Sequence, residues 1–281
     1  MKPDAVAVIT YPGHCISTVL TIKNLYTLTK WQVPCYLFID DIGEQYQQWQ
    51  GNYLDDIKQF YNNQLDVGLR FVLFSEFGFK KIWDGWLRQQ LVKLNIDQFM
   101  QNNLWYVTDG DVHLNRMCNF TVSPYNFVPH YNSDVYAQNC TYIKHILQLD
   151  NVVRTYDNRE IFSHHAPFRW IERSLLTGLR KYVQDCFNED FNELHWHLMK
   201  ELKILGLGPT NDNMSMTEWD LIEAYKQFVL KESLNLEFWA TGDDFNTFFG
   251  TDKDVDNTRY AQYNIQVPQN IQDKILTISR T

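Results

Sequence analysis

The first 110 residues alternate between two hydrophobic periods, and this alternation most restricts the possible fold. Short apolar runs indicate buried strands at Ala5–Thr10, Cys35–Ile39, Arg70–Phe74 and Leu104–Thr108. Between these runs, apolar residues recur at the spacing of an amphipathic helix. Short buried strands that alternate with amphipathic helices are typical of a parallel sheet covered on both faces. The sequence therefore predicts an α/β fold with a Rossmann-type mixed, mainly parallel sheet flanked by helices.

The second half of the chain is predicted to be more helical. The pattern weakens between residues 112 and 160, where Phe120–Asn132 is rich in Pro, Asn and aromatic residues and indicates a loop. Apolar stripes at helical spacing then return in three groups: Phe168, Ile171, Leu175, Leu179 and Tyr182; Phe191, Leu194 and Leu198; and Trp219, Ile222 and Val229. We therefore expect a helical C-terminal part.

The net charge argues against a nucleic-acid-binding protein, and the cysteine spacing argues against a zinc site or a disulfide framework. The chain has 25 Lys and Arg against 34 Asp and Glu, a net charge of −9, so its overall field does not attract nucleic acid. A nucleic-acid partner would need a local basic patch, and the short candidates for one are Lys80, Lys81, Arg88 and Lys93. A solvated helix face explains these residues equally well. The five Cys form no CxxC pair, and neither a signal peptide nor an 18-residue apolar run is found. We expect a cytoplasmic protein without a membrane span.

Polar residues follow three of the predicted strands where each strand ends. These segments are Tyr11-Pro12-Gly13, Asp40-Asp41 and Asp109-Gly110-Asp111. Because ligands of open α/β sheets bind beyond the carboxyl ends of the strands, we expect all three segments at one ligand-binding edge.

The Asp109-Gly110-Asp111 segment is the strongest chemical signal. Two neighbouring carboxylates repel each other unless a cation lies between them or both turn into water. Mg²⁺ and Mn²⁺ prefer oxygen ligands and leave positions open for phosphate groups. The sequence therefore predicts a site for Mn²⁺ or Mg²⁺, with an ordinary acidic turn after a strand as the alternative.

Four segments resemble a known family. Leu104–Leu114 (LWYVTDGDVHL) looks like the strand and DxD element of GT-A glycosyltransferases. Together with Gly85–Leu94, Ser163–Phe168 and Met216–Tyr225, in this order, it is similar to the poorly characterised DUF6492-type GT-A proteins. The resemblance covers roughly residues 5–230. It implies a GT-A-like fold and a metal-dependent glycosyltransferase that moves a sugar from a nucleoside-diphosphate sugar, a UDP-sugar first, to a hydroxyl acceptor.

The resemblance also implies roles for single residues. Asp111 would ligate the metal, and Asp109 would contact the metal or the ribose of the nucleotide. The base and ribose would lie near Tyr11, Pro12 and Asp40. Residues 1–115 would form the nucleotide-sugar-binding half, and residues 116–281 the acceptor-binding, more helical half of the same domain. No Lys/Arg-rich phosphate loop is present, so Arg88 is the candidate partner of the diphosphate.

Histidines downstream of the acidic motif are candidates for the metal shell. In many GT-A enzymes such a His completes the metal ligands, which implies His165 or His164 here. Pro167 suits the first turn of the helix expected from Phe168, so one His could instead cap or pack. By contrast, we expect His195 and His197, on an amphipathic helix, to lie at the surface.

The segment Thr217–Asp220 opens the next predicted helix. Thr217 and Asp220 have the spacing of a capping box, so local structure alone explains them. The functional alternative is that Glu218 or Asp220 faces the acceptor, where an inverting enzyme needs a general base. Trp219 stacks on a sugar ring or anchors the helix.

Two other functions remain open from sequence. An acidic pair at a strand end also suits a metal-dependent nucleotidyltransferase, which would release pyrophosphate rather than a nucleoside diphosphate. A non-catalytic carbohydrate-binding protein is the third possibility. The acceptor could be a glycan or, against the acidic balance, a hydroxymethylated base in phage-type DNA, which would have to leave the duplex. The sequence does not reveal the oligomeric state.

Overall fold

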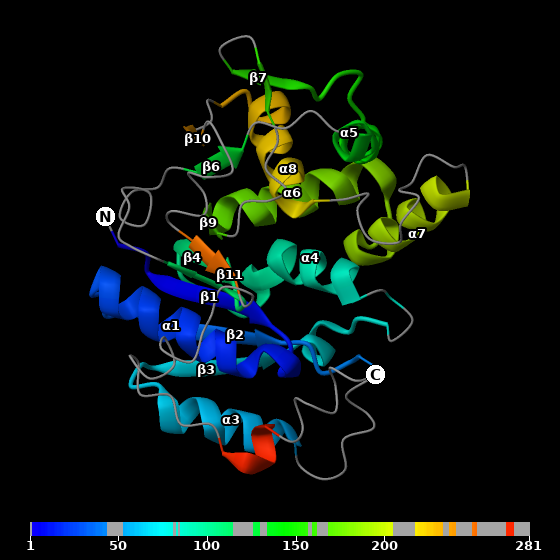
Figure 1. Ribbon diagram of the computed structural model, residues 1–281. Coiled ribbons are helices and arrows are strands. Elements are labelled where there is room, and N and C mark those ends of the chain that lie inside the picture. The colour runs from blue at the N-terminus through cyan, green and yellow to red at the C-terminus, as the bar shows by residue number, and fades with distance from the viewer. Residues whose placement is uncertain are drawn as a thin grey trace.

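A central sheet flanked by helices organises the chain (Figure 1). It is seen in a computed structural model that describes residues 2–43, 53–80, 83, 85–114, 126–129, 134–156, 159–161, 168–204, 217–232, 236–239, 249–251 and 268–272. The sheet has five strands in the order β3-β2-β1-β4-β9. Their bounds are Leu69–Leu73 (β3), Cys35–Ile39 (β2), Ala5–Thr10 (β1), Leu104–Asp109 (β4) and Phe168–Glu172 (β9).

The first four of these strands run parallel, and only β9 is antiparallel to its neighbour β4. The predicted fold class, an α/β fold with a mixed and mainly parallel sheet, is therefore confirmed. Three of the four predicted strands begin at the predicted residue, and β3 begins one residue earlier.

Helices cover both faces of the sheet. On one face lie α1 (Cys15–Thr29) and α3 (Tyr53–Gln64), and on the other lie α4 (Gly85–Asn95), α6 (Arg173–Phe187), α7 (Phe191–Ile204) and α8 (Glu218–Ala224). Alternate residues of β1 face the two layers: Val6 and Val8 pack toward α1, while Ala5, Ala7 and Ile9 pack toward α4 and α8. Because both faces are buried, the strand is apolar throughout, as its sequence predicted.

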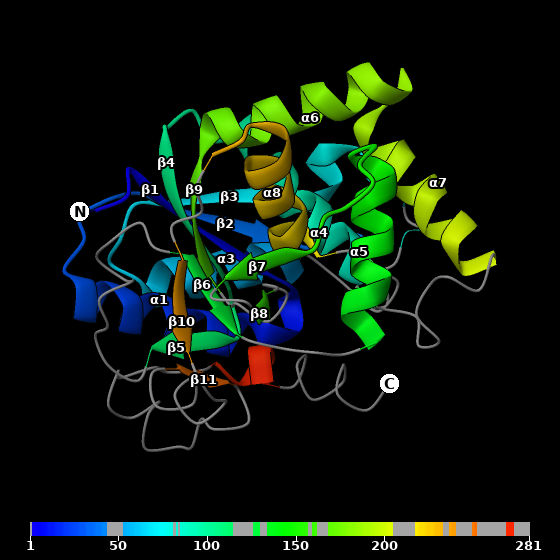
Figure 2. The same cartoon turned by 90° about the horizontal axis from the view of Figure 1, so that it is seen from above.

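Seen from above (Figure 2), α8 lies over the sheet with α6 and α5 (Asp134–Ile146) beside it. The helix continues as one π-helical stretch, Tyr225–Val229. The short strands pair outside the main sheet: β5 (Val112–Leu114) with β11 (Phe249–Thr251), β6 (Asn126–Pro129) with β10 (Leu236–Trp239), and β7 (Arg154–Tyr156) with β8 (Arg159–Ile161).

Two sequence predictions are wrong for physical reasons. Phe168–Glu172 is strand β9 rather than the start of a helix, and α6 begins only at Arg173. Trp170 and Ile171 are buried on opposite faces of the sheet, as neighbours in a strand are. The apolar residues of this segment also match helical spacing, so the strand was not recognised from sequence. Within the predicted loop, residues 126–129 form β6, because they pair with β10 about 110 residues later, a partner that local patterns do not reveal.

The prediction of a surface position is also wrong for His195. Its side chain is fully buried, with its ring against Phe191 and its Nδ1 hydrogen-bonded to the hydroxyl of Tyr142. Burial lowers the pKa of His195 to about 3. His197, two residues further along α7, is exposed and pairs with Glu189, as a surface residue would. Among the described residues, no helix combines the length and the apolar character needed to cross a membrane.

The buried His195 should make the fold sensitive to acid. Its folded-state pKa of about 3 lies below the ordinary histidine value of 6.5, so below pH 6.5 the unfolded chain takes up a proton that the fold excludes. Stability is thus fully present above pH 6.5 and is lost as the pH falls. Between pH 7 and pH 5 this one group should account for about 2 kcal/mol of unfolding free energy.

The measurement is urea unfolding at both pH values for the wild type, His195→Gln and the exposed control His197→Gln. We expect a smaller pH effect in His195→Gln alone. Equal pH effects in all three proteins would contradict the assignment.

Candidate functional site

The carboxyl ends of β1, β2 and β4 meet at one edge of the sheet. Register places Thr10 beside Ile39 and Ile9 beside Asp109. The segments that begin at Tyr11, Asp40 and Asp109 therefore leave neighbouring strands at the same edge, as the sequence predicted.

The turn between β4 and β5 is fixed against α1. The Gly110 amide donates to the Ile9 carbonyl at 2.8 Å, and the Thr21 hydroxyl donates to the Gly110 carbonyl at 3.1 Å. A Cβ at Gly110 would lie 2.5 Å from Thr18 Oγ1 and 2.9 Å from Thr10. Glycine is thus required here by close packing and not by a left-handed backbone, since Gly110 has no positive φ.

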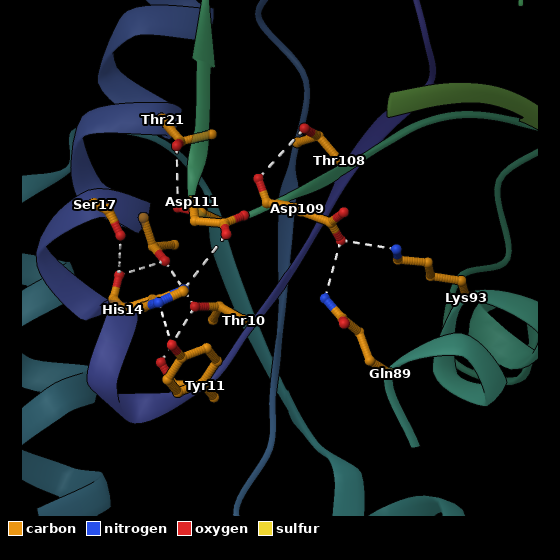
Figure 3. A network of polar contacts seen from close by, with 12 residues as sticks. Thr10, Tyr11, His14, Ser17, Thr21, Gln89, Lys93, Thr108, Asp109 and Asp111 are labelled. Carbon is orange, nitrogen blue, oxygen red and sulfur yellow. Dashed lines mark hydrogen bonds and ion pairs between the residues drawn. The ribbon is translucent and has the colours of Figure 1, made fainter. Parts of the chain in front are cut away.

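The two carboxylates of this turn point to different partners (Figure 3). Asp109 Oδ1 accepts from Lys93 Nζ at 2.9 Å and from Gln89 Nε2 at 3.2 Å, both on α4. Asp111 Oδ2 faces His14 Nδ1 at 3.9 Å, where α1 begins. The Asp111 side chain is 41% exposed against 21% for Asp109, so Asp111 is the more accessible carboxylate.

Lys93 joins the acidic turn to α8. Its ammonium lies 2.9 Å from Asp109 and 2.8 Å from Glu218 Oε1, and the Lys93 and Glu218 side chains are both buried. Burial raises the pKa of Asp109 and of Glu218, although the nearby Lys93 ammonium lowers both values in part. Burial alone would lower the pKa of Lys93, but the two carboxylates outweigh it and raise that pKa. One ammonium faces two carboxylates, so the cluster carries one negative charge in excess when both are ionised.

Trp219 packs over this cluster. Lys93 Nζ lies 5.2 Å and the Arg169 guanidinium carbon 5.7 Å from its ring centroid, which is within the range of cation–π contacts. Arg169 also lies 3.4 Å from Glu223 Oε1. Trp219 is buried, so the geometry favours the anchoring role of this residue over an open stacking platform for a sugar.

Asp220 takes part in a buried hydrogen-bond network. Its Oδ2 accepts from Asn139 Nδ2 at 2.7 Å and from the Thr217 hydroxyl at 2.6 Å. The Thr217 amide donates to Asn139 Oδ1 at 3.3 Å. The predicted capping box is therefore absent, because the Thr217 hydroxyl serves as a donor to Asp220 and makes no cap hydrogen bond.

Arg88 and Asp40 form a buried pair. Arg88 Nη2 lies 2.8 Å from Asp40 Oδ2 and Arg88 Nη1 donates to the Trp83 carbonyl, while the Ile42 amide donates to Asp40 Oδ1 at 3.0 Å. The prediction of a solvated basic face is thus wrong for Arg88 and Lys93, which are 5% and 3% exposed. Lys80 is indeed exposed and pairs with Glu193.

His14 is the residue of this site that sequence reasoning missed. Its Nε2 is hydrogen-bonded to the Tyr11 hydroxyl, and its carbonyl accepts the hydroxyls of Ser17 and Thr18 at 2.9 and 2.8 Å. Pro12 is buried in the short 3₁₀ turn Pro12–His14. Burial lowers the pKa of His14 to about 4. The sequence signal that could have identified His14 is its position directly after Tyr11-Pro12-Gly13, a segment already expected at the ligand edge.

His164 and His165 lie outside the described residues, so their predicted part in a metal shell stays a prediction. Within the part of the chain that the structure describes, no group of three His, Cys, Asp or Glu side chains is arranged to hold a metal ion.

No protein-family model matches the chain, and no curated protein matches it. The resemblance to DUF6492-type proteins therefore stays a prediction. Among solved structures, the chain is similar to the galactosyltransferase LgtC in complex with donor and acceptor sugar analogues, with 9% identity, a TM-score of 0.45, and 98% of this chain and 95% of that chain covered.

Two further solved structures are similar. They are HddC from Yersinia pseudotuberculosis (10% identity, TM-score 0.39, 92% and 97% covered) and the inositol-1-phosphate CTP transferase from T. maritima (9% identity, TM-score 0.42, 94% and 96% covered). Identities and TM-scores as low as these carry no function over to this chain.

Gly110→Ala should displace the acidic turn. The added methyl would overlap Thr18 and Thr10, and forcing a group into a packed site costs about 1–3 kcal/mol. Gly68→Ala is the matched control, since no atom lies within 4 Å of a Cβ there. The check is the urea midpoint of both variants. A Gly110→Ala protein as stable as Gly68→Ala would show that the turn has room to move.

Lys93→Met should be strongly destabilising at pH 7. It leaves the buried Glu218 and the partly buried Asp109 without their shared cation, and breaking a buried pair in this way costs about 3–5 kcal/mol. Lys181→Met, which removes an exposed pair with Asp185, should cost at most about 1 kcal/mol.

Adding Glu218→Gln to Lys93→Met should restore part of the stability, measured by chemical unfolding, because one buried charge is then gone. Failure of the double variant to recover stability would contradict the electrostatic cause.

Proposed function

We propose that the chain is a metal-dependent glycosyltransferase that moves a sugar from a nucleoside-diphosphate sugar to a hydroxyl acceptor. The observation that carries this proposal is the excess negative charge at the carboxyl edge of the sheet. There Asp109 and Glu218 share a single ammonium, and a third carboxylate, Asp111, is half-exposed beside them. A dication and a phosphate-bearing ligand complement that arrangement.

The donor set fits Mn²⁺ or Mg²⁺. Asp111 offers accessible carboxylate oxygens, while Asp109 Oδ1 is already held by Lys93 and Gln89. Oxygen donors are what both ions prefer, and both retain positions for substrate phosphates. Such an ion supplies Lewis-acid stabilisation of the diphosphate that leaves when a sugar is transferred. We assign Asp111 as direct ligand and Asp109 as a contact of the metal or the ribose.

Other residues of this edge would hold the nucleotide. We assign Tyr11, Pro12 and Asp40 to the base and ribose of a UDP-sugar and residues 1–115 to the donor half. Arg88 is bound to Asp40, so it acts by orienting that carboxylate more than by reaching the diphosphate. Lys93 is the nearer cation to the acidic turn and offsets part of the charge that Asp109 brings.

Residues 116–281 would form the acceptor half. Glu218 stays the candidate base, because its raised pKa suits proton transfer, and it must part from Lys93 to reach an acceptor hydroxyl. Asp220 would hold Asn139 and the start of α8 in place. His165 or His164 would complete the metal shell, in a cytoplasmic enzyme whose acceptor is a glycan.

The proposal predicts cooperative stabilisation by Mn²⁺ and a nucleoside diphosphate. If the Mn²⁺–nucleotide complex binds as one ligand and is present at about 100 times its dissociation constant, it should raise the unfolding free energy by about 2.7 kcal/mol. The measurement is thermal unfolding with UDP, GDP or CDP, each with and without Mn²⁺. Asp111→Asn should abolish the metal-dependent part, whereas Asp185→Asn, an exposed carboxylate on α6, should leave it intact.

Product analysis then separates the chemistries. Release of a nucleoside diphosphate supports sugar transfer, and pyrophosphate release would point to nucleotidyl transfer instead. Sugar binding that Asp111→Asn leaves unchanged, without turnover, would favour a carbohydrate-binding protein.

A further inference from the structure

The clearest unexplained contact at this edge lies between His14 and Asp111. His14 Nδ1 and Asp111 Oδ2 are 3.9 Å apart. A hydrogen bond between nitrogen and oxygen requires about 3.2 Å or less, so these atoms are too far apart to share a proton directly. They still point toward each other across the edge of the sheet (Figure 3).

We propose that His14 Nδ1 and Asp111 Oδ2 are two ligands of one divalent cation, so that the metal is bound by α1 as well as by the acidic turn. The inference deepens the proposed function and rests on it, since both place the cation at Asp111. It adds a nitrogen ligand from the residues that follow β1.

The distance fits a shared cation. Ligand atoms at about 2.1 Å from one metal ion lie about 3.0 Å apart at a right angle and about 3.4 Å apart at a tetrahedral angle. From 3.9 Å, a closing movement of less than about 1 Å suffices. Asp111 is half-exposed, which gives its side chain room for that movement.

Hydrogen bonds already hold His14 and the turn that carries Asp111 in position for a shared ligand. The Tyr11 hydroxyl is hydrogen-bonded to Nε2 of His14, and the other ring nitrogen, Nδ1, lies 3.9 Å from Asp111 Oδ2. Metal-bound histidines characteristically have their second nitrogen held in this way. The His14 carbonyl is anchored by Ser17 and Thr18, and the turn that carries Asp111 is anchored through Gly110. The backbone that carries each ligand is therefore already held in place before the ion binds.

A nitrogen ligand has a consequence for metal preference. Imidazole binds Co²⁺ and other transition ions well, whereas Mg²⁺ prefers oxygen donors. Replacing His14 by Gln should therefore weaken Co²⁺ and Mn²⁺ binding at least about tenfold and weaken Mg²⁺ binding less. Tyr11→Phe, which removes only the hydroxyl on Nε2, should give a smaller loss in the same direction.

The decisive experiment is electron spin-echo spectroscopy of Mn²⁺ bound to the full-length protein, which detects directly coordinated nitrogen. The set comprises the wild type, His14→Gln, the double variant His164→Gln/His165→Gln and the exposed control His197→Gln. We expect nitrogen coupling in the wild type and in the control, and its loss in His14→Gln. Circular dichroism and the urea midpoint verify that each variant is folded.

The outcomes separate this inference from the proposed function. Wild-type protein that binds Mn²⁺ without nitrogen coupling, or coupling that survives in His14→Gln and disappears in the double variant, would overturn the role of His14 and leave the metal site standing. If the wild type binds no Mn²⁺, with or without UDP, the proposed function fails and this inference fails with it.

Discussion

Lys93 is the charge on which the site depends. Its ammonium is buried between Asp109, at the end of β4, and Glu218, at the start of α8, so one side chain ties the sheet to the helical layer. In a medium of low polarity an uncompensated carboxylate is costly, so both carboxylates need Lys93 close by. The ion pairs therefore connect α4, α8 and the end of β4 and shape the electrostatic field at the ligand edge.

Much of the fold follows from local sequence signals. The apolar runs at Ala5–Thr10 and Cys35–Ile39 correspond to β1 and β2 residue for residue, because strands buried on both faces leave a continuous apolar pattern. Strand β9 and strand β6 were missed for the opposite reason. Their identity comes from partners far along the chain, and Phe168–Glu172 carries apolar residues that also match a helix.

The sequence predicts those parts of the site that depend on the order of residues within one segment, and not those that depend on how distant segments pack. Asp109 ends one buried strand, Asp111 comes just after it and Asp40 follows another, so register alone brings them to one edge. The burial of Lys93 and its contact with Glu218 depend on how two helices pack, and no spacing encodes this. Likewise, the closeness of Gly110 to Thr18 depends on how α1 packs against the turn, which no local sequence pattern encodes.

The separation of Asp109 and Glu218 along the chain has a consequence for biosynthesis. When the first parallel strands leave the ribosome, Lys93 has one carboxylate partner, Asp109, and the pair is balanced. Glu218 emerges more than a hundred residues later and must dock against an already formed pair. Contacts of such high sequence separation form late, since the intervening loop must first be closed. The ligand edge should thus mature as one of the last events of folding, after the nascent N-terminal sheet is in place.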